Sequence, residues 1–295
     1  MKNERRALAF GLTAVVLWST AATAFKLALA ELTPLQLLTV AIVASTLALM
    51  LSVMWQGRLG ELGALLRGHA PRFMVFGAMN PLLYYWCLLT AYDLLPAQQA
   101  QTINYTWAIV LAILSVPMLG QRLGARDCLA VALGYLGVVV IATEGDPGSM
   151  QFTSATGLSF ALGSTLVWAL FWLLNTRSTH DPSLALTGGF LCATPIAVVL
   201  CATLGGGVPP LGFPLASAVY VGFFEMGFTW LLWSLALRSA RNVSRVGNLI
   251  FLSPLLSLGL IATVLDEPVH PATLIGFALI LPGVLLQQRS GGQTA

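Results

Sequence analysis

The residue best placed for chemistry inside an apolar stretch of this sequence is a single carboxylate, Glu225. It lies in the segment GFFEMG, about twelve residues from either end of the apolar segment 213–237. If that segment spans a membrane, the carboxylate is too deep to reach the surface, and ionisable groups at such depth are costly and are functional candidates. Glu225 could bind a substrate amine or carry a proton. The alternative is a neutral acid that hydrogen-bonds two helices together.

Aromatic and polar residues recur at helical spacing on several other apolar segments, which places them on common helix faces. A cavity lined in this way would hold a flat apolar body and hydrogen-bond a polar head, as small-molecule sites generally do. Any one aromatic residue is also typical of a packed core or of an interfacial belt, to which we assign Trp55 and Phe73. The residues expected to line a common substrate site are Trp18, Asn80, Tyr84, Asn104, Trp107, Trp168 and Glu225.

Other side chains with chemical potential do not form a catalytic or metal-binding pattern. The three histidines lie in predicted loops, and the four cysteines lie in apolar segments without paired spacing. Neither a disulfide framework nor a metal site is indicated. Lys26 can extend to the outer interface, where it could attract carboxylates. We therefore expect no enzyme, no metal and no cofactor, and no selectivity ring of the kind that a channel requires.

The elements that position these residues are membrane-spanning helices. Hydrophobic residues make up 57% of the 295 residues and charged residues only 8%, against roughly 25% charged in a soluble domain. A membrane helix needs about 20 mostly apolar residues. Ten segments meet this requirement, with a tight turn at Pro96 between the third and the fourth. The predicted spans are 7–29, 34–55, 72–94, 97–119, 127–143, 156–175, 183–204, 213–237, 242–265 and 271–287.

The distribution of basic residues predicts the orientation of these spans. Thirteen of the 14 Lys and Arg residues fall in the two termini or in alternate loops. The opposite loops contain mainly Asp and Glu. The positive-inside rule places such basic loops, and therefore both termini, in the cytoplasm.

The sequence also contains a predicted internal repeat. Residues 1–146 and 154–295 each contain five predicted spans, and residues 147–153 form the predicted linker. The segment 129–138 parallels 275–284, and Trp18 and Trp168 occupy similar places, as do Trp86 and Trp233. Because five is an odd number, the second half must enter from the opposite side of the membrane, as in transporters with inverted repeats. Chance similarity between apolar helices is the alternative.

These features resemble the EamA branch of the drug/metabolite transporter superfamily. The resemblance rests on the five-plus-five helices, on the Trp in the first helix of each half and on the pattern that closes each half. Within the family, the segments LWST (17–20) and NYTW (104–107) look most like those of bacterial aromatic amino acid exporters. Gln121 stands where many members carry the acidic residue that Glu267 supplies here, and we interpret that acidic residue as structural.

The sequence therefore predicts an all-α polytopic protein of the bacterial inner membrane that exports small amphipathic metabolites by alternating access. Aromatic and other neutral amino acids are the first substrate hypothesis. A proton-coupled multidrug extruder that uses Glu225 is the alternative. The expected partners are a small-molecule substrate and the lipid bilayer, with no nucleic acid, and a monomer should suffice for transport.

Overall fold

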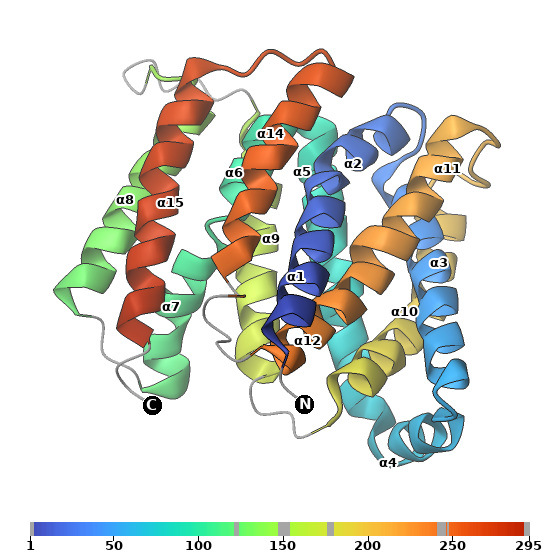
Figure 1. Ribbon diagram of the computed structural model, residues 1–295. Coiled ribbons are helices and arrows are strands. Elements are labelled where there is room, and N and C mark those ends of the chain that lie inside the picture. The colour runs from blue at the N-terminus through green and yellow to red at the C-terminus, as the bar shows by residue number, and fades with distance from the viewer. Residues whose placement is uncertain are drawn as a thin grey trace. The chain divides into compact units, whose positions relative to one another are not determined.

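The computed structural model is helical in all its regular elements across the residues that it describes, which are 3–120, 124–146, 154–175, 180–240, 246 and 248–291 (Figure 1). Within these ranges, seven helices are long and apolar enough to span a membrane. Three shorter apolar helices, Val131–Ile141, Leu252–Val264 and Pro271–Pro282, lie at the fifth, ninth and tenth predicted spans. The predicted polytopic helical fold is thus confirmed. Gln121 and the predicted linker 147–153 lie outside the described residues.

The chain folds as two compact units, and each combines segments from both predicted halves. The first unit comprises Met1–Leu82 and Thr179–Leu265, and the second comprises Leu83–Ser178 and Asp266–Ala295. The first contains α1 (Glu4–Ser19), α2 (Ala21–Leu29), α3 (Pro34–Trp55), α4 (Leu59–Gly77), α10 (Pro182–Leu204), α11 (Phe213–Tyr220), the π-helix η2 (Val221–Phe228), α12 (Thr229–Ser239), η3 (Asn248–Phe251) and α14 (Leu252–Val264). The division of the sequence into two repeats stays a prediction.

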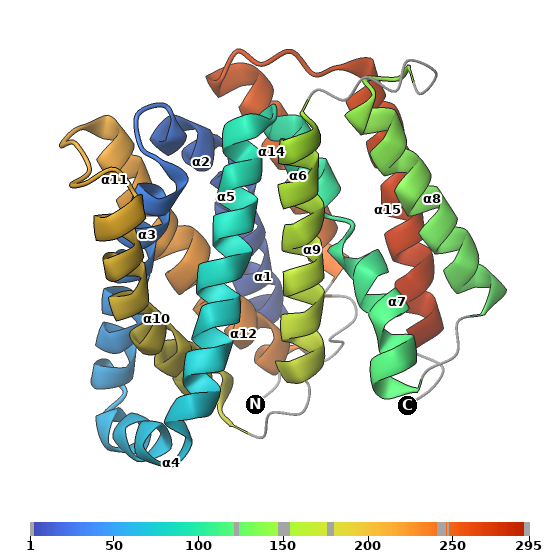
Figure 2. The same ribbon diagram turned by 180° about the vertical axis from the view of Figure 1, so that it is seen from behind.

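The second unit contains α5 (Tyr84–Leu94), α6 (Ala97–Asn104), α7 (Trp107–Leu119), α8 (Ala125–Ala142), α9 (Ala155–Asn175) and α15 (Pro271–Gly291). Two helix pairs dominate its packing, α8 with α15 and α5 with α9. Both views show α8 and α15 running side by side (Figures 1 and 2). Gly137 and Gly276 lie at this crossing, where a β-carbon on either would meet the backbone carbonyl of the other at 2.6–2.7 Å. Small residues at such crossings let membrane helices approach closely.

Helix starts follow the capping chemistry of the sequence. Thr33 and Gln36 form a capping box at the start of α3, and Asp181 accepts hydrogen bonds from two amides at the start of α10. A proline follows each cap at the first helical position, where its missing N–H is not needed. The predicted turn before Ala97 is also confirmed, since α5 ends at Leu94.

Two predicted spans that we expected to be single helices are broken. The first span ends as α1 at Ser19 and restarts as α2 at Ala21, and the fourth is divided between α6 and α7. At both breaks a threonine hydroxyl donates to a carbonyl three residues earlier, Thr20 to Leu17 at 2.7 Å and Thr106 to Ile103 at 2.7 Å. Such side-chain bonds compete with the backbone ladder and bend or interrupt helices.

Two further spans lose α-helical geometry near their middle. The third contains the π-helix η1 (Ala78–Leu83), in which Asn80 has extended dihedral angles (φ −141°, ψ 115°) and Pro81 supplies no N–H. The eighth contains η2, which carries Glu225. π-helical turns occur frequently at functional sites. The two π-helices carry the candidate residues Asn80 and Glu225, respectively.

Candidate functional site

The second unit brings two predicted site residues, Tyr84 and Trp107, against the indole of a third, Trp168. The ring of Trp168 on α9 is stacked on that of Tyr84 on α5, with centroids 4.5 Å apart and planes inclined by 27°. Trp107, the first residue of α7, meets Trp168 edge-on at 6.5 Å. Phe171 and Trp172 contact the same indole from one turn further along α9. Offset-stacked and edge-on geometries are the favoured arrangements of aromatic rings. We call these five residues the Trp168 cluster.

Polar groups border this cluster through Asn104. Its amide nitrogen donates to the hydroxyl of Ser164 on α9 at 2.9 Å, and its amide oxygen accepts from the hydroxyl of Tyr84 at 3.4 Å. Asn104 can take this position because α6 ends there, which directs the chain away before α7 begins. An amide side chain can make four hydrogen bonds. Asn104 is half-buried, and its bonds to Ser164 and Tyr84 use two of these four.

The cluster has the chemistry of a site for a flat, neutral molecule. Trp168 and Tyr84 are buried, whereas Trp107, Phe171 and Trp172 are half-buried. None of the five residues, nor Asn104 or Ser164, carries a formal charge at neutral pH. Apolar aromatic walls with a few placed polar groups are characteristic of small-molecule sites.

A second aromatic cluster lies in the first unit, around Trp18 on α1. Its indole meets those of Trp230 and Trp233 on α12 at centroid distances of 5.5 and 5.3 Å. The hydroxyls of Thr20 and Tyr220 are 2.8 Å apart, and the ring of Tyr220 contacts that of Phe224 at 4.8 Å. Sequence reasoning missed Trp230 and Trp233 as neighbours of Trp18, and it missed the contacts of Tyr220 with Thr20 and Phe224. The spacing of Trp230 and Trp233, three residues apart on one helix face, was the available signal.

The other two predicted site residues of the first unit lie on the interrupted helices. Glu225 is half-buried in η2, and Asn80 is buried in η1. The Asn80 Oδ1 atom is buried and has no hydrogen-bond partner among the described residues, and the same holds for the hydroxyls of Ser45 and Thr229. Tyr84, Asn104, Trp107 and Trp168 thus meet in one unit, while Trp18, Asn80 and Glu225 lie in the other. A site common to all seven stays a prediction.

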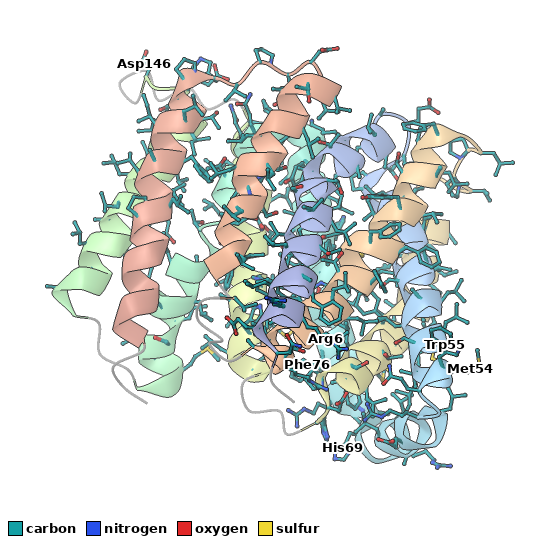
Figure 3. The ribbon with its side chains drawn as sticks, in the orientation of Figure 1. Arg6, Met54, Trp55, His69, Phe76 and Asp146 are labelled. Carbon is teal, nitrogen blue, oxygen red and sulfur yellow. The ribbon has the colours of Figure 1, made fainter. Side chains whose placement is uncertain are left out.

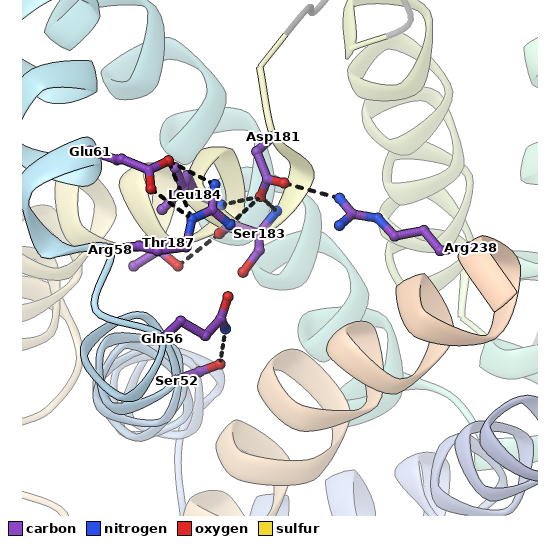
Figure 4. A network of polar contacts seen from close by, with 9 residues as sticks. All are labelled: Ser52, Gln56, Arg58, Glu61, Asp181, Ser183, Leu184, Thr187 and Arg238. Carbon is purple, nitrogen blue, oxygen red and sulfur yellow. Dashed lines mark hydrogen bonds and ion pairs between the residues drawn. The ribbon is translucent and has the colours of Figure 1, made fainter. Parts of the chain in front are cut away.

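An ion-pair network links three elements of the first unit through Arg58, Asp181 and Arg238 (Figure 4). The Asp181 carboxylate accepts from Arg238 Nη2 at 3.1 Å and faces Arg58 Nη1 at 3.5 Å, while Arg58 also pairs with Glu61 at 2.9 Å. Asp181 therefore joins the start of α10 to the last turn of α12 and to the residue that precedes α4. Burial alone would raise the pKa of Asp181, but hydrogen bonds from Arg238 and the Leu184 amide, followed by the arginine charges, hold it below its ordinary value.

Of the two aromatic residues that we assigned to the interfacial belt, Trp55 is exposed and Phe73 is buried. Trp55 is 93% exposed and projects from the end of α3 (Figure 3), as a belt residue would. Phe73 is only 3% exposed, so our assignment of Phe73 to the belt was wrong. Its ring lies 5.9 Å from that of His180 and also packs against Gly188. Phe73 is buried because α4, which is kinked at His69, packs against α10 at Gly188.

Among the described residues, seven helices of membrane-spanning length and apolar composition indicate a multi-pass membrane protein. The chain belongs to the EamA-like transporter family, whose model matches residues 5–143 and again 155–287. It is a multi-pass protein of the bacterial inner membrane. Members of this family are transporters, which points away from an enzyme.

Three similar proteins put this assignment in context. The aromatic amino acid exporter YddG of Ancylobacter novellus is 25% identical over 291 residues, which covers 95% of this chain and 96% of that protein. The uncharacterised transporter YvbV of Bacillus subtilis is 25% identical over 240 residues, which covers 76% of this chain and 74% of that protein. A solved crystal structure aligns with 99% of both chains at a TM-score of 0.68 and 21% identity, which indicates the same fold.

Proposed function

We propose that this transporter exports small amphipathic metabolites, with aromatic and other neutral amino acids as its first substrates. The observation that carries the proposal is the Trp168 cluster. Its stacked and edge-on rings offer apolar faces to a planar side chain, and the Asn104 amide offers hydrogen bonds to a polar head. The aromatic amino acid exporter of Ancylobacter novellus, similar along nearly the whole chain, supports the same substrate class.

Alternating access is the mechanism that we propose, with the halves 1–146 and 154–295 as an inverted repeat and both termini in the cytoplasm. Helix pairing within the units supports the repeat. The first span packs on the eighth (α1 on α12), and correspondingly the sixth packs on the third (α9 on α5). The second packs on the eighth (α3 on η2), and the seventh on the third (α10 on α4). Exchanging the halves turns each pairing into its counterpart. The two matches of one family model support it as well.

In such a transporter, two similar halves packed in two ways give inward-open and outward-open states around one site near the midplane. We expect the seven predicted residues to line that site, which would open alternately to the two sides of the membrane. Ten spans are enough for a complete inverted-repeat transporter, so we expect the monomer to be competent.

The experiment that tests the substrate class is counterflow in proteoliposomes. Vesicles preloaded with unlabelled phenylalanine or tryptophan should take up the labelled amino acid without any imposed ion gradient. Trp168→Leu should raise the KM for aromatic substrates roughly tenfold, because one or two aromatic contacts of about 0.5–1.5 kcal/mol each are lost. Trp55→Leu, at the exposed indole, is the matched control and should behave as the wild type. Absence of counterflow in the wild type would refute the proposed substrate class.

A proton-coupled multidrug extruder is the second candidate, and one observation favours it. Glu225, the carboxylate of the eighth span, lies within η2, and a single-turn departure from α-helical geometry is common where a helix serves a function. In this reading Glu225 carries the proton. Extrusion of a cationic dye driven by a pH gradient, without amino acid counterflow, would favour this function over amino acid export.

A further inference from the structure

The linker between α14 and α15 holds the start of α6 through three hydrogen bonds within the second unit. Glu267 Oε2 accepts from the backbone N–H of Ala97 at 3.2 Å. The Gln98 side chain donates to the Pro268 carbonyl at 2.8 Å and accepts from the His270 amide at 3.0 Å. We call residues 267–270 the α6 clamp. An anion at a helix N-terminus satisfies an otherwise unpaired N–H and interacts favourably with the helix dipole.

α6 is the element through which this clamp reaches the Trp168 cluster. It has only eight residues, and Asn104 is its last. At 1.5 Å per residue, its two ends are about 10 Å apart. Every residue from Ala97 to Ile103 is buried, and α6 packs against α9 and α15, so it is enclosed by its own unit. A short enclosed helix transmits a shift at its first residue to its last.

We propose that Glu267 is a positioning residue for the Trp168 cluster: by fixing α6 at Ala97 it sets the places of Asn104 and Trp107. This inference rests on the proposed function, because it takes the cluster as the substrate site. Glu267 itself lies at the opposite end of α6 from Asn104 and would act through the helix. Glu267, which we interpreted from the sequence as structural, would thereby affect substrate affinity.

Removal of the Glu267 carboxylate would affect α6 through the backbone N–H of Ala97. Ala97 is fully buried, so without Glu267 its N–H loses its partner in a place that water does not reach. A buried unsatisfied donor is expensive, and α6 would shift or fray at its first turn to relieve it. The amides of Tyr105 and Thr106, which bond to Gln101 and Ile103 at the α6–α7 break, would then lose protection.

The test compares Glu267→Ala, Glu267→Gln and Asp266→Asn in the full-length protein. Glu267→Gln keeps an oxygen that can accept from Ala97. Asp266 is the exposed neighbouring acid, so its replacement controls for loss of charge. Hydrogen exchange at the amides of residues 97–106 reports on α6, and counterflow of labelled phenylalanine gives KM and maximal rate separately.

We expect Glu267→Ala to accelerate exchange from Ala97 through Thr106 and to raise the KM roughly tenfold, with a smaller change in maximal rate. Glu267→Gln should restore most of both, and Asp266→Asn should match the wild type. If Glu267→Ala does not fold, Gln98→Ala loosens the same end of α6 and should change both measurements in the same direction. Faster exchange at an unchanged KM would overturn the inference, and so would unchanged exchange.

The inference and the proposed function fail in different ways. A wild-type protein without phenylalanine counterflow contradicts the proposed function and leaves the exchange data to decide the positioning role. In that case, faster exchange at Tyr105 and Thr106 in Glu267→Ala supports the role, and exchange confined to Ala97–Gln99 overturns it.

Discussion

Gly77 on α4 lies against the backbone carbonyl of Gly189 on α10 so closely that a β-carbon at Gly77 has no space. A flexible side chain could yield to such a contact, but a backbone carbonyl within a helix cannot. The crossing of these two helices is therefore set by the absence of a side chain at Gly77, since a β-carbon at Gly189 would meet nothing closer than 3.7 Å. Close approach of this kind replaces the hydrophobic driving force that helices lack in lipid.

Gly77→Ala should separate α4 from α10 and destabilise the protein by about 1–3 kcal/mol, as overpacking generally does. Thermal unfolding in detergent would show the loss as a lower Tm. Gly63→Ala is the matched control on the same helix, because a β-carbon there meets nothing within 4 Å. An equal Tm for Gly77→Ala and the wild type would contradict the importance of this contact.

Asp181→Asn should lower stability at neutral pH by about 1 kcal/mol, the scale of a partly exposed ion-pair network. Asparagine still caps α10, so only the ion pairs with Arg58 and Arg238 are lost. Because the folded-state pKa of Asp181 is held below its ordinary value, its stabilisation is present above that value and is lost as the pH falls through the folded-state pKa. The variant and the wild type should therefore converge in stability below about pH 4.

The measurement for Asp181 is the unfolding midpoint as a function of pH, with Asp93→Asn as control. Asp93 is exposed, and its replacement should leave the profile unchanged. A difference between Asp181→Asn and the wild type that stayed constant down to acid pH would show that the ion pairs are not its source.

Tyr84→Phe should keep the stack on Trp168 and remove the hydroxyl that donates to Asn104. We expect a rise in KM of about two- to tenfold, since a typical neutral hydrogen bond contributes about 0.5–1.5 kcal/mol. Tyr84→Leu removes the ring as well and should raise the KM further. Counterflow with phenylalanine measures both, and equal effects of the two variants would mean that the ring stack contributes nothing to binding.

Glu225→Gln separates the two candidate functions through the pH profile of transport. If Glu225 carries a proton, the variant should transport at a rate independent of pH and should not respond to a pH gradient. If the carboxylate only ties helices together, counterflow and its pH profile should remain as in the wild type. Met226→Leu, an adjacent apolar exchange of similar volume, serves as the control for packing changes in η2.

The positions of the membrane helices could be predicted because hydropathy and capping are local properties. Pro34 after Thr33 and Pro182 after Asp181 mark helix starts in the sequence as clearly as in the structure. The breaks at Thr20 and Thr106 could not be located in this way, since a threonine in a membrane helix bonds a preceding carbonyl without always breaking the helix.

The candidate site was partly predictable for a related reason. Helical spacing groups residues on one segment, so the shared face of Ser164 and Trp168, four residues apart, follows from the sequence alone. Which segments meet is decided by long-range packing. The spacing of Trp230 and Trp233 marks a common helix face, but it does not indicate that Trp18 packs on that face. The burial of Phe73 depends likewise on the long-range packing of α4 against α10 at Gly188.

The enclosed polar helix α6 has a consequence for how the protein enters the membrane. Its sequence AQQAQTIN contains three glutamines, all buried, and the helix 97–118 is the least apolar of the seven candidate spans. Transfer of such a segment from the translocon into lipid is unfavourable when it is alone. Gln99 and Asn104 find partners in Glu144 and Ser164, but Gln98 meets Pro268 and His270 only once the linker 266–270 has been synthesised, about 170 residues later. The fourth span therefore acquires its full set of polar contacts only after the linker that precedes α15 has been synthesised.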